Sequence, residues 1–93
     1  MTAGLDGGAR PALVAGMRLQ YEPAQSAHVL LYPEGMVKLN GTAGAILERC
    51  SGERTLEQIV ADLEKSYGAS GLTKDVSAFI AYALEKHWLE LRA

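Results

Sequence analysis

The sequence predicts a small α+β domain in which a three-stranded antiparallel sheet is followed by three helices, a winged helix-turn-helix-like arrangement. Three observations lead to this prediction. Between residues 17 and 39, apolar residues alternate with polar ones at the two-residue period of β-strands. Beyond residue 42, apolar residues recur at helical spacing. The stretch between, LNGTAGAILERCSGERT over residues 39–55, carries the start and stop signals of one helix and the start of a second.

The composition fits one globular domain. The chain has 93 residues, of which 48% are hydrophobic, enough for a core in a domain of this size. Its net charge of −2, with both signs interspersed, lacks the basic excess that nucleic-acid-binding proteins usually carry. The single cysteine, Cys50, excludes a disulfide within the chain and a metal site built from cysteines, and it fits a reducing compartment.

The N-terminal residues carry neither the charged segment nor the unbroken apolar run of a signal peptide. No apolar run approaches the ~20 residues that a membrane-spanning helix needs, so we expect a soluble, cytoplasmic protein. Residues 1–16 are rich in Gly and Ala and show neither the strand nor the helix period. We expect a flexible N-terminal arm there, and a single domain over residues 17–93.

Three short strands are expected after this arm. Residues 17–22 (MRLQYE) alternate cleanly between apolar and polar, and residues 28–32 (HVLLY) are rich in β-formers. Pro33 and Gly35 favour a tight turn in YPEG, because proline presets φ at the second position and glycine relieves crowding at the fourth. Residues 36–39 (MVKL) then form a third strand, antiparallel to the second.

The first two helices have recognisable ends. Asn40 and Thr42 are both suitable N-caps, because a side-chain oxygen can accept a hydrogen bond from a first-turn amide. Gly52 is expected to end this helix. Thr55, with Gln58 three residues later, is a capping-box pattern that predicts the start of the second helix. The apolar stripes are Ala43, Ile46, Leu47 and Cys50 in the first helix, and Leu56, Ile59, Val60, Leu63 and Tyr67 in the second.

A third helix is expected to begin at a Thr73 cap, after a break at residues 68–71. Leu89 and Leu91 favour an extended tail that packs back on the domain. A small antiparallel sheet must bury one face, and the helices are the available cover. The apolar stripe of the third helix is Val76, Phe79, Ile80, Ala83, Leu84 and His87, with Trp88 at its edge.

No set of residues indicates catalysis or a cofactor. His28 and His87 lie on separate elements, without a second ligand at metal-binding spacing. Cys50 falls on an apolar helical face, which favours a buried thiol over a nucleophile. The serines lack the context of a nucleophile elbow, and Gly41 and Gly44 lack the Lys-Ser/Thr pair of a phosphate loop. We therefore expect a protein that is not an enzyme and uses no cofactor or metal.

DNA binding by a winged helix is one alternative. The second and third predicted helices could form a helix-turn-helix whose last helix enters the major groove. Its first turns offer Lys74 and Asp75, and the whole helix adds only Lys86 as a further cation. Because phosphate contacts provide much of the affinity for DNA, this helix has few groups to supply it.

Peptide binding at a sheet edge is the other alternative. The third strand is short, apolar and placed at an edge, so its unpaired amides and carbonyls can accept an extended peptide as a fourth strand. In a purely structural interpretation, Met36, Val37, Leu39 and Phe79 belong to the core instead. Periodicity alone favours that structural interpretation.

The chain resembles the PqqD family of pyrroloquinoline quinone (PQQ) biosynthesis between about residues 31 and 89. Each matching piece is weak alone, but their order and spacing over most of a short domain are specific. The chain departs from the family pattern at Ser51, where Asp is usual, and at His87, where Gly is frequent. The matching pieces are Pro33-Glu34-Gly35, Leu39-Asn40, Thr42-Ala43, Ile46-Leu47, Cys50, Gly52, Thr55, Ile59, Asp75-Val76, Phe79-Ile80 and Trp88-Leu89.

The resemblance implies a non-catalytic peptide chaperone, a recognition element for a ribosomally made and post-translationally modified peptide (RiPP). It would bind the precursor peptide PqqA by strand addition and present it to the radical-SAM enzyme PqqE. Winged-helix DNA binding remains the alternative function. A free sheet edge also invites pairing with a second copy, so we expect a monomer or a homodimer that pairs edges or exchanges a strand.

The resemblance also implies a binding cleft between the third strand and the third helix. Lys38 would be the polar side chain on the strand, able to meet an acidic residue of the peptide. Phe79 could serve the core and the cleft with one ring. The residues of the cleft are Met36, Val37, Lys38, Leu39, Val76, Phe79, Ile80 and Ala83.

Overall fold

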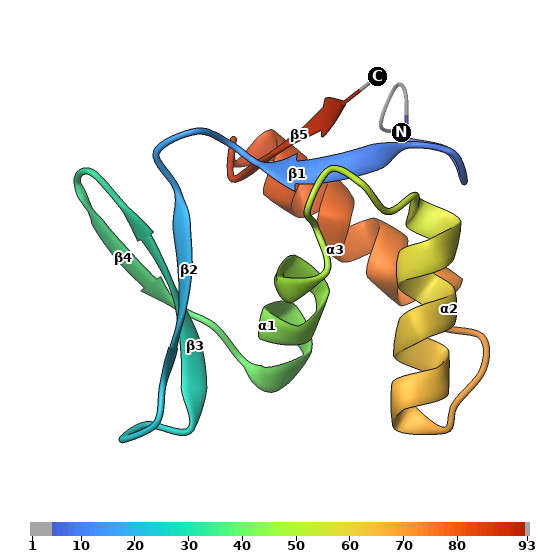
Figure 1. The fold of residues 1–93 in the computed structure, drawn as a ribbon, viewed down its shortest axis with the longest axis horizontal. Coiled ribbons are helices and arrows are strands. Elements are labelled where there is room, and N and C mark those ends of the chain that lie inside the picture. Colours follow the sequence, from blue (N-terminus) through green and yellow to red (C-terminus); the bar gives the residue numbers. More distant parts are fainter. Residues whose placement is uncertain (1–4, 93) are drawn as a thin grey trace.

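A computed structural model describes residues 5–92 (Figure 1). Within that range, no helix is long and apolar enough to cross a membrane. The three helices, together with a three-stranded antiparallel sheet and a two-stranded one, confirm the predicted α+β class. The elements follow in the order β1 (Arg10–Leu13), β2 (Arg18–Glu22), β3 (Ala27–Tyr32), β4 (Gly35–Lys38), α1 (Gly41–Glu48), α2 (Leu56–Tyr67), α3 (Thr73–Glu85) and β5 (Leu89–Arg92).

The larger sheet has the order β2-β3-β4, and both pairs are antiparallel as expected from the sequence. In its register, Leu30 of β3 lies opposite Leu19 of β2 and opposite Val37 of β4. These three side chains therefore share one face of the sheet. Leu30 is fully buried on that face and belongs to the core that the helices also line. The sheet lies to one side of the helices (Figure 1).

The second sheet is a two-stranded ribbon of β1 and β5, and it was not expected from the sequence. Ala12 of β1 pairs with Glu90 of β5 and also forms an isolated bridge with Ser51. Ala12 is only 1% exposed. The sequence predicted a flexible arm over residues 1–16, whereas residues 10–13 of it form strand β1. Residues 1–4 of that arm lie outside the described range.

Side chains at the cap positions fix the starts of α1 and α2. Asn40 caps α1, because its side-chain oxygen accepts a hydrogen bond from the Ala43 amide at 2.7 Å. Thr55 and Gln58 form the predicted capping box at the start of α2. That helix ends at Gly68, whose φ of 62° is in the left-handed region that glycine tolerates.

Two helix boundaries differ from the sequence prediction. Thr73 is the first residue of α3 rather than its cap; the cap position is Leu72, with no side-chain cap bond. Glu64 of α2 instead accepts a hydrogen bond from the Leu72 amide at 3.0 Å. This bond ties the residue before α3 to α2, whereas no side chain caps the first-turn amides of α3. Helix α1 ends at Glu48, before the predicted stop at Gly52.

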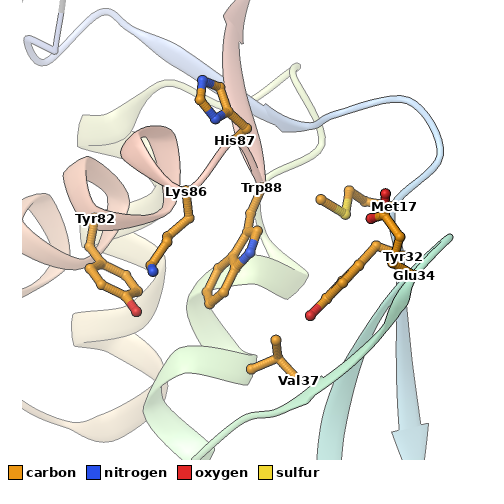
Figure 2. A pocket seen from close by; sticks show the side chains of 8 residues that line it. All are labelled: Met17, Tyr32, Glu34, Val37, Tyr82, Lys86, His87 and Trp88. Atoms are coloured by element: carbon orange, nitrogen blue, oxygen red, sulfur yellow. The ribbon is translucent and has the colours of Figure 1, made fainter.

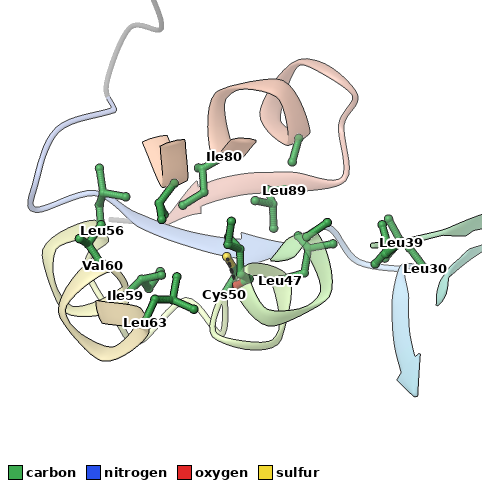
Figure 3. Packing of buried hydrophobic residues seen from close by; sticks show 14 residues of the cluster. Leu30, Leu39, Leu47, Cys50, Leu56, Ile59, Val60, Leu63, Ile80 and Leu89 are labelled. Atoms are coloured by element: carbon green, nitrogen blue, oxygen red, sulfur yellow. Dashed lines mark hydrogen bonds between the residues drawn. The ribbon is translucent and has the colours of Figure 1, made fainter. Parts of the chain in front are cut away.

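The core is one cluster of buried side chains to which all three helices contribute (Figure 3). Leu30 and Leu39 extend it to the sheet, and Leu89 extends it to β5. Phe79, Leu84 and Trp88 are partly buried and pack against it. The fully buried members Ile46, Leu47, Ile59, Leu63 and Ile80 come from the predicted apolar stripes. Burial of each such side chain contributes about 1.5–3 kcal/mol to folding before entropic costs.

An ion pair joins α1 to α2 at the edge of this core. The guanidinium of Arg49 donates from Nε to Asp62 at 2.5 Å and from a terminal nitrogen to the Ala45 carbonyl at 2.8 Å. The hydrogen bond from Arg49 lowers the pKa of the Asp62 carboxyl group.

The larger sheet packs against the helices where Gly44 of α1 closely approaches His28 of β3. A Cβ atom added at Gly44 would lie 2.6 Å from Nδ1 and 3.0 Å from Cβ of His28. The imidazole is also held by Tyr21, whose ring meets it edge-on at 5.1 Å, and by Glu48 at 3.7 Å. Glycine is therefore required at this position for α1 and β3 to pack at this distance.

We predict that Gly44→Ala destabilises the protein by about 1–3 kcal/mol, the usual result of overpacking, although alanine is normally the better helix former. Gly41→Ala is the matched control, because no atom lies within 4 Å of a Cβ there. Urea unfolding of both variants checks this. Gly44→Ala as stable as Gly41→Ala would show that the approach to His28 is not a constraint.

We predict that Ala12→Asp lowers the free energy of unfolding by about 2 kcal/mol or more, because it places a carboxylate where β1 is buried. Ala15→Asp, at an exposed residue after the strand, should change stability by less than about 0.5 kcal/mol. Urea midpoints of the two variants give the comparison. Equal, small effects would mean that residues 10–13 are the flexible arm that the sequence suggested.

Candidate functional site

A groove of about 560 Å³ lies between the β3–β4 hairpin and the C-terminal end of α3 (Figure 2). Val37 and Tyr32 form the wall on the sheet side, and Tyr82 and Lys86 form the wall on the helix side. Trp88 lies between the two walls (Figure 2). The lining residues are Met17, Tyr32, Glu34, Val37, Tyr82, Lys86, His87 and Trp88.

The turn after α3 places Trp88 in the groove. His87 has a φ of 64°, which reverses the chain in the left-handed region. The Trp88 amide then donates back to the Ala83 carbonyl at 2.9 Å, and the Trp88 carbonyl accepts from the Val14 amide at 3.0 Å. Trp88 is thus held on one side by the helix end and on the other by the chain following β1.

Aromatic rings form a packed platform on the helix side. The Tyr82 and Trp88 rings meet edge-to-face at 5.6 Å, and the Lys86 ammonium lies 5.6 Å from the centre of the Tyr82 ring. Tyr82 remains 48% exposed although it is large and largely apolar. Exposed aromatic surface in a concave site is typical of places where another molecule packs.

Strand β4 borders this groove and is an edge strand, because the sheet order is β2-β3-β4. Within the described residues no strand pairs with its outer side. Backbone amides and carbonyls on an unpaired edge are a template for a further strand.

The register shows which backbone groups are free. Leu39 donates its amide to the His28 carbonyl at 3.0 Å, so these two residues are a hydrogen-bonded pair. Bonded and non-bonded pairs alternate along an antiparallel ladder, so the amide and carbonyl of Val37 also point to β3. Those of Met36 and Lys38 consequently point to the free edge.

The four strand residues of the predicted cleft divide between the two faces of the sheet. Val37 lines the groove, whereas Leu39 is 6% exposed and belongs to the core. The side chains of Met36 and Lys38 are exposed, and by the alternation of a strand they lie on the face opposite Val37. Met36 is 57% exposed. Whether these residues contact a peptide stays a prediction.

The four helix residues of the predicted cleft lie deeper than expected. Val76, Ile80 and Ala83 are at most 3% exposed and form part of the core. Phe79 is half-buried and packs against the same cluster, with its ring 6.4 Å from that of Tyr82. A molecule in the groove would meet the next turn of the helix, at Tyr82 and Lys86, before it reached these side chains.

Val37 is the lining residue that the predicted cleft included; the lining residues outside that prediction are Met17, Tyr32, Glu34, Tyr82, Lys86, His87 and Trp88. A usable signal existed for Tyr82. It is a large ring beside the buried stripe rather than in it, so it could not be fully covered by the core. Trp88 was placed at the edge of that stripe, which agrees with its partly buried position in the groove.

The described residues contain neither a metal-binding cluster nor an activated thiol. No group of three or more His, Cys, Asp or Glu side chains there could hold a metal ion. Burial raises the pKa of the Cys50 thiol to about 12, so it stays protonated at neutral pH and is a weak nucleophile. Its Sγ donates to the Ile46 carbonyl at 3.2 Å.

The charges on α3 do not form a basic face. Lys74 is followed by Asp75 in the first turn, and Lys86 is preceded by Glu85 at the end of the helix. All four side chains are exposed, and Lys74 and Lys86 lie at opposite ends of the helix, so the two cations do not form a continuous patch. This arrangement gives no support to binding of α3 in a DNA groove.

Residues 27–89 match the family model described as Coenzyme PQQ synthesis protein D (PqqD). The chain is 52% identical over 83 residues to a protein of Stutzerimonas stutzeri named PqqA binding protein, a match that covers 88% of this chain and 90% of the relative. A protein of the same name from Azotobacter vinelandii is 51% identical over 82 residues, covering 87% of this chain and 89% of the relative.

The fold is similar to a solution NMR structure of the PqqD truncation of Methylobacterium extorquens PqqCD, which is described as a functional, stand-alone RiPP recognition element. The TM-score is 0.71 at 32% sequence identity, and the match covers 94% of this chain and 95% of the other.

Proposed function

This chain belongs to the PqqD family, and we propose that it is a non-catalytic chaperone that binds the precursor peptide PqqA in the course of PQQ biosynthesis. The name of its relatives, PqqA binding protein, supports this peptide as the ligand. The recognition element with the same fold supports a role in presenting a peptide for modification.

The observation that carries the proposal is the position of the free edge of β4 beside an aromatic groove. An extended peptide can bond to the amides and carbonyls of Met36 and Lys38, as a fourth strand of the sheet. Alternate side chains of that strand would then point into the groove, toward Val37 and Trp88. No backbone rearrangement is required, since these groups already point outward.

The two kinds of contact have different roles. Main-chain hydrogen bonds fix the register of the peptide and contribute about 1 kcal/mol each, but they do not distinguish one sequence from another. The apolar surfaces of Tyr82, Trp88 and Val37 distinguish peptides by the size and shape of the side chains they bury. Selectivity would therefore come from the groove and register from the strand edge.

We further propose that the bound peptide is presented in the cytoplasm to the radical-SAM enzyme PqqE. Holding the peptide close to an enzyme raises its local concentration there without any change in chemistry. Pairing of two β4 edges in a homodimer would occupy the same backbone groups as the peptide. We therefore propose that the peptide-binding form is the monomer.

Calorimetric titration of the protein with PqqA tests strand addition when Met36→Pro is compared with Met36→Ala. Both variants lose the methionine side chain, but only proline also removes the outward amide. We expect Met36→Ala to bind almost normally and Met36→Pro to bind at least about fivefold more weakly, from the loss of one hydrogen bond of ~1 kcal/mol.

Circular dichroism must show that both variants are folded. Proline at Val37 is not suitable for this purpose, since the Val37 amide points to β3 and its loss would disrupt the sheet itself. Equal binding by the two folded Met36 variants would contradict peptide addition at β4. Absence of binding by the unaltered protein would contradict the PqqA-binding function.

A further inference from the structure

We propose that Lys86 is a specificity residue of the groove, and that it binds a carboxylate of the peptide on a side chain that points into the groove. The inference rests on the proposed function, because it takes the groove to be the peptide site. It names the chemistry of the ligand at one position: an Asp or Glu on the inward-facing side of the added strand.

The position of Lys86 suits recognition of a negative charge, because its ammonium lies next to the Tyr82 ring at the groove. The ammonium lies 5.6 Å from the centre of the Tyr82 ring, and Tyr82 in turn packs edge-to-face on Trp88. Figure 2 shows the Lys86 side chain next to the Tyr82 ring, at the helix side of the groove. A lysine ordered in this way loses less side-chain entropy when it pairs with a ligand than a freely rotating one.

The charge of Lys86 is not matched within the described part of the chain. The ion pairs found there are His28–Glu48, Arg49–Glu48 and Arg49–Asp62, and none includes Lys86. Glu34 lines the same groove from the hairpin, but it forms no ion pair with Lys86. Lys86 is thus an exposed cation beside an aromatic surface, and it has no ion-pair partner in the described residues that a peptide carboxylate would have to displace.

The pleat of the sheet decides which peptide side chains Lys86 can reach. Side chains of an added strand alternate between the groove face, shared with Val37, and the opposite face, shared with Met36 and Lys38. Lys86 lies on the groove side, so it can pair only with peptide residues of the inward set. Lys38 lies on the other face and would meet only residues of the outward set.

This geometry predicts the pattern of the recognised segment. In the peptide, the acidic residue that pairs with Lys86 lies an even number of positions from the apolar residue that packs against Val37 and Trp88. An acidic residue at an odd spacing would face Lys38 instead. Lys86 and Lys38 carry the same charge but lie on opposite sides of the sheet that the peptide would extend. Lys38 is therefore the matched control for Lys86.

The test is a set of double-mutant cycles measured by calorimetry with PqqA. Each Asp and Glu of the peptide is replaced singly by Asn or Gln, and each peptide is titrated into the unaltered protein, Lys86→Gln, Lys86→Arg and Lys38→Gln. We expect Lys86→Gln to weaken PqqA binding about fivefold, the upper end for a partly exposed ion pair. Lys86→Arg should retain most of the affinity because arginine keeps the charge and also packs over aromatic rings.

The supporting result is one peptide amide variant that weakens binding to the unaltered protein and to Lys38→Gln, but not to Lys86→Gln. If PqqA binds and no carboxylate couples to Lys86, or if the same carboxylate couples to Lys38, the inference is overturned while the proposed function stands. If the unaltered protein does not bind PqqA at all, the proposed function fails and the inference fails with it.

Discussion

The contact between α1 and β3, where the backbone of Gly44 meets the ring of His28, is the constraint on which the rest of this structure depends. It holds the larger sheet against the helices with only one face covered by the core. Because β2 and β4 are both edges of that sheet, its position relative to α3 decides what each edge can bind. Here it leaves β4 bordering the groove at the end of α3.

The ribbon of β1 and β5 lies next to the segments that carry Met17 and Trp88 into the groove. Trp88 precedes β5 directly, and its carbonyl is held by the chain that follows β1. The first and last strands therefore fix the aromatic floor, while the middle of the chain supplies the strand edge. The site therefore needs both the terminal strands and the middle of the chain. Because the fold itself holds both parts in place, the binding surface is formed before a peptide binds.

Much of the fold could be predicted from the sequence because its signals are local. The alternation over residues 17–39 gave the three central strands, and Thr55 with Gln58 located the start of α2. Signals that depend on distant partners were missed, as with β1, which pairs across most of the chain length, and the hydrogen bond from the Leu72 amide to Glu64 of another helix. For the site, periodicity showed that Ile80 and Ala83 lie on an apolar face, but not that other elements cover it completely.

Amide hydrogen exchange, resolved by residue and measured with and without PqqA, tests the central claim most directly. In the free protein the amides of Met36 and Lys38 should exchange rapidly, because they point away from β3, while Val37 is protected. Addition of the peptide should protect Met36 and Lys38 and leave Val37 unchanged. Unchanged exchange at Met36 and Lys38, with new protection at Leu19 and Tyr21 on the opposite edge, would contradict binding at β4.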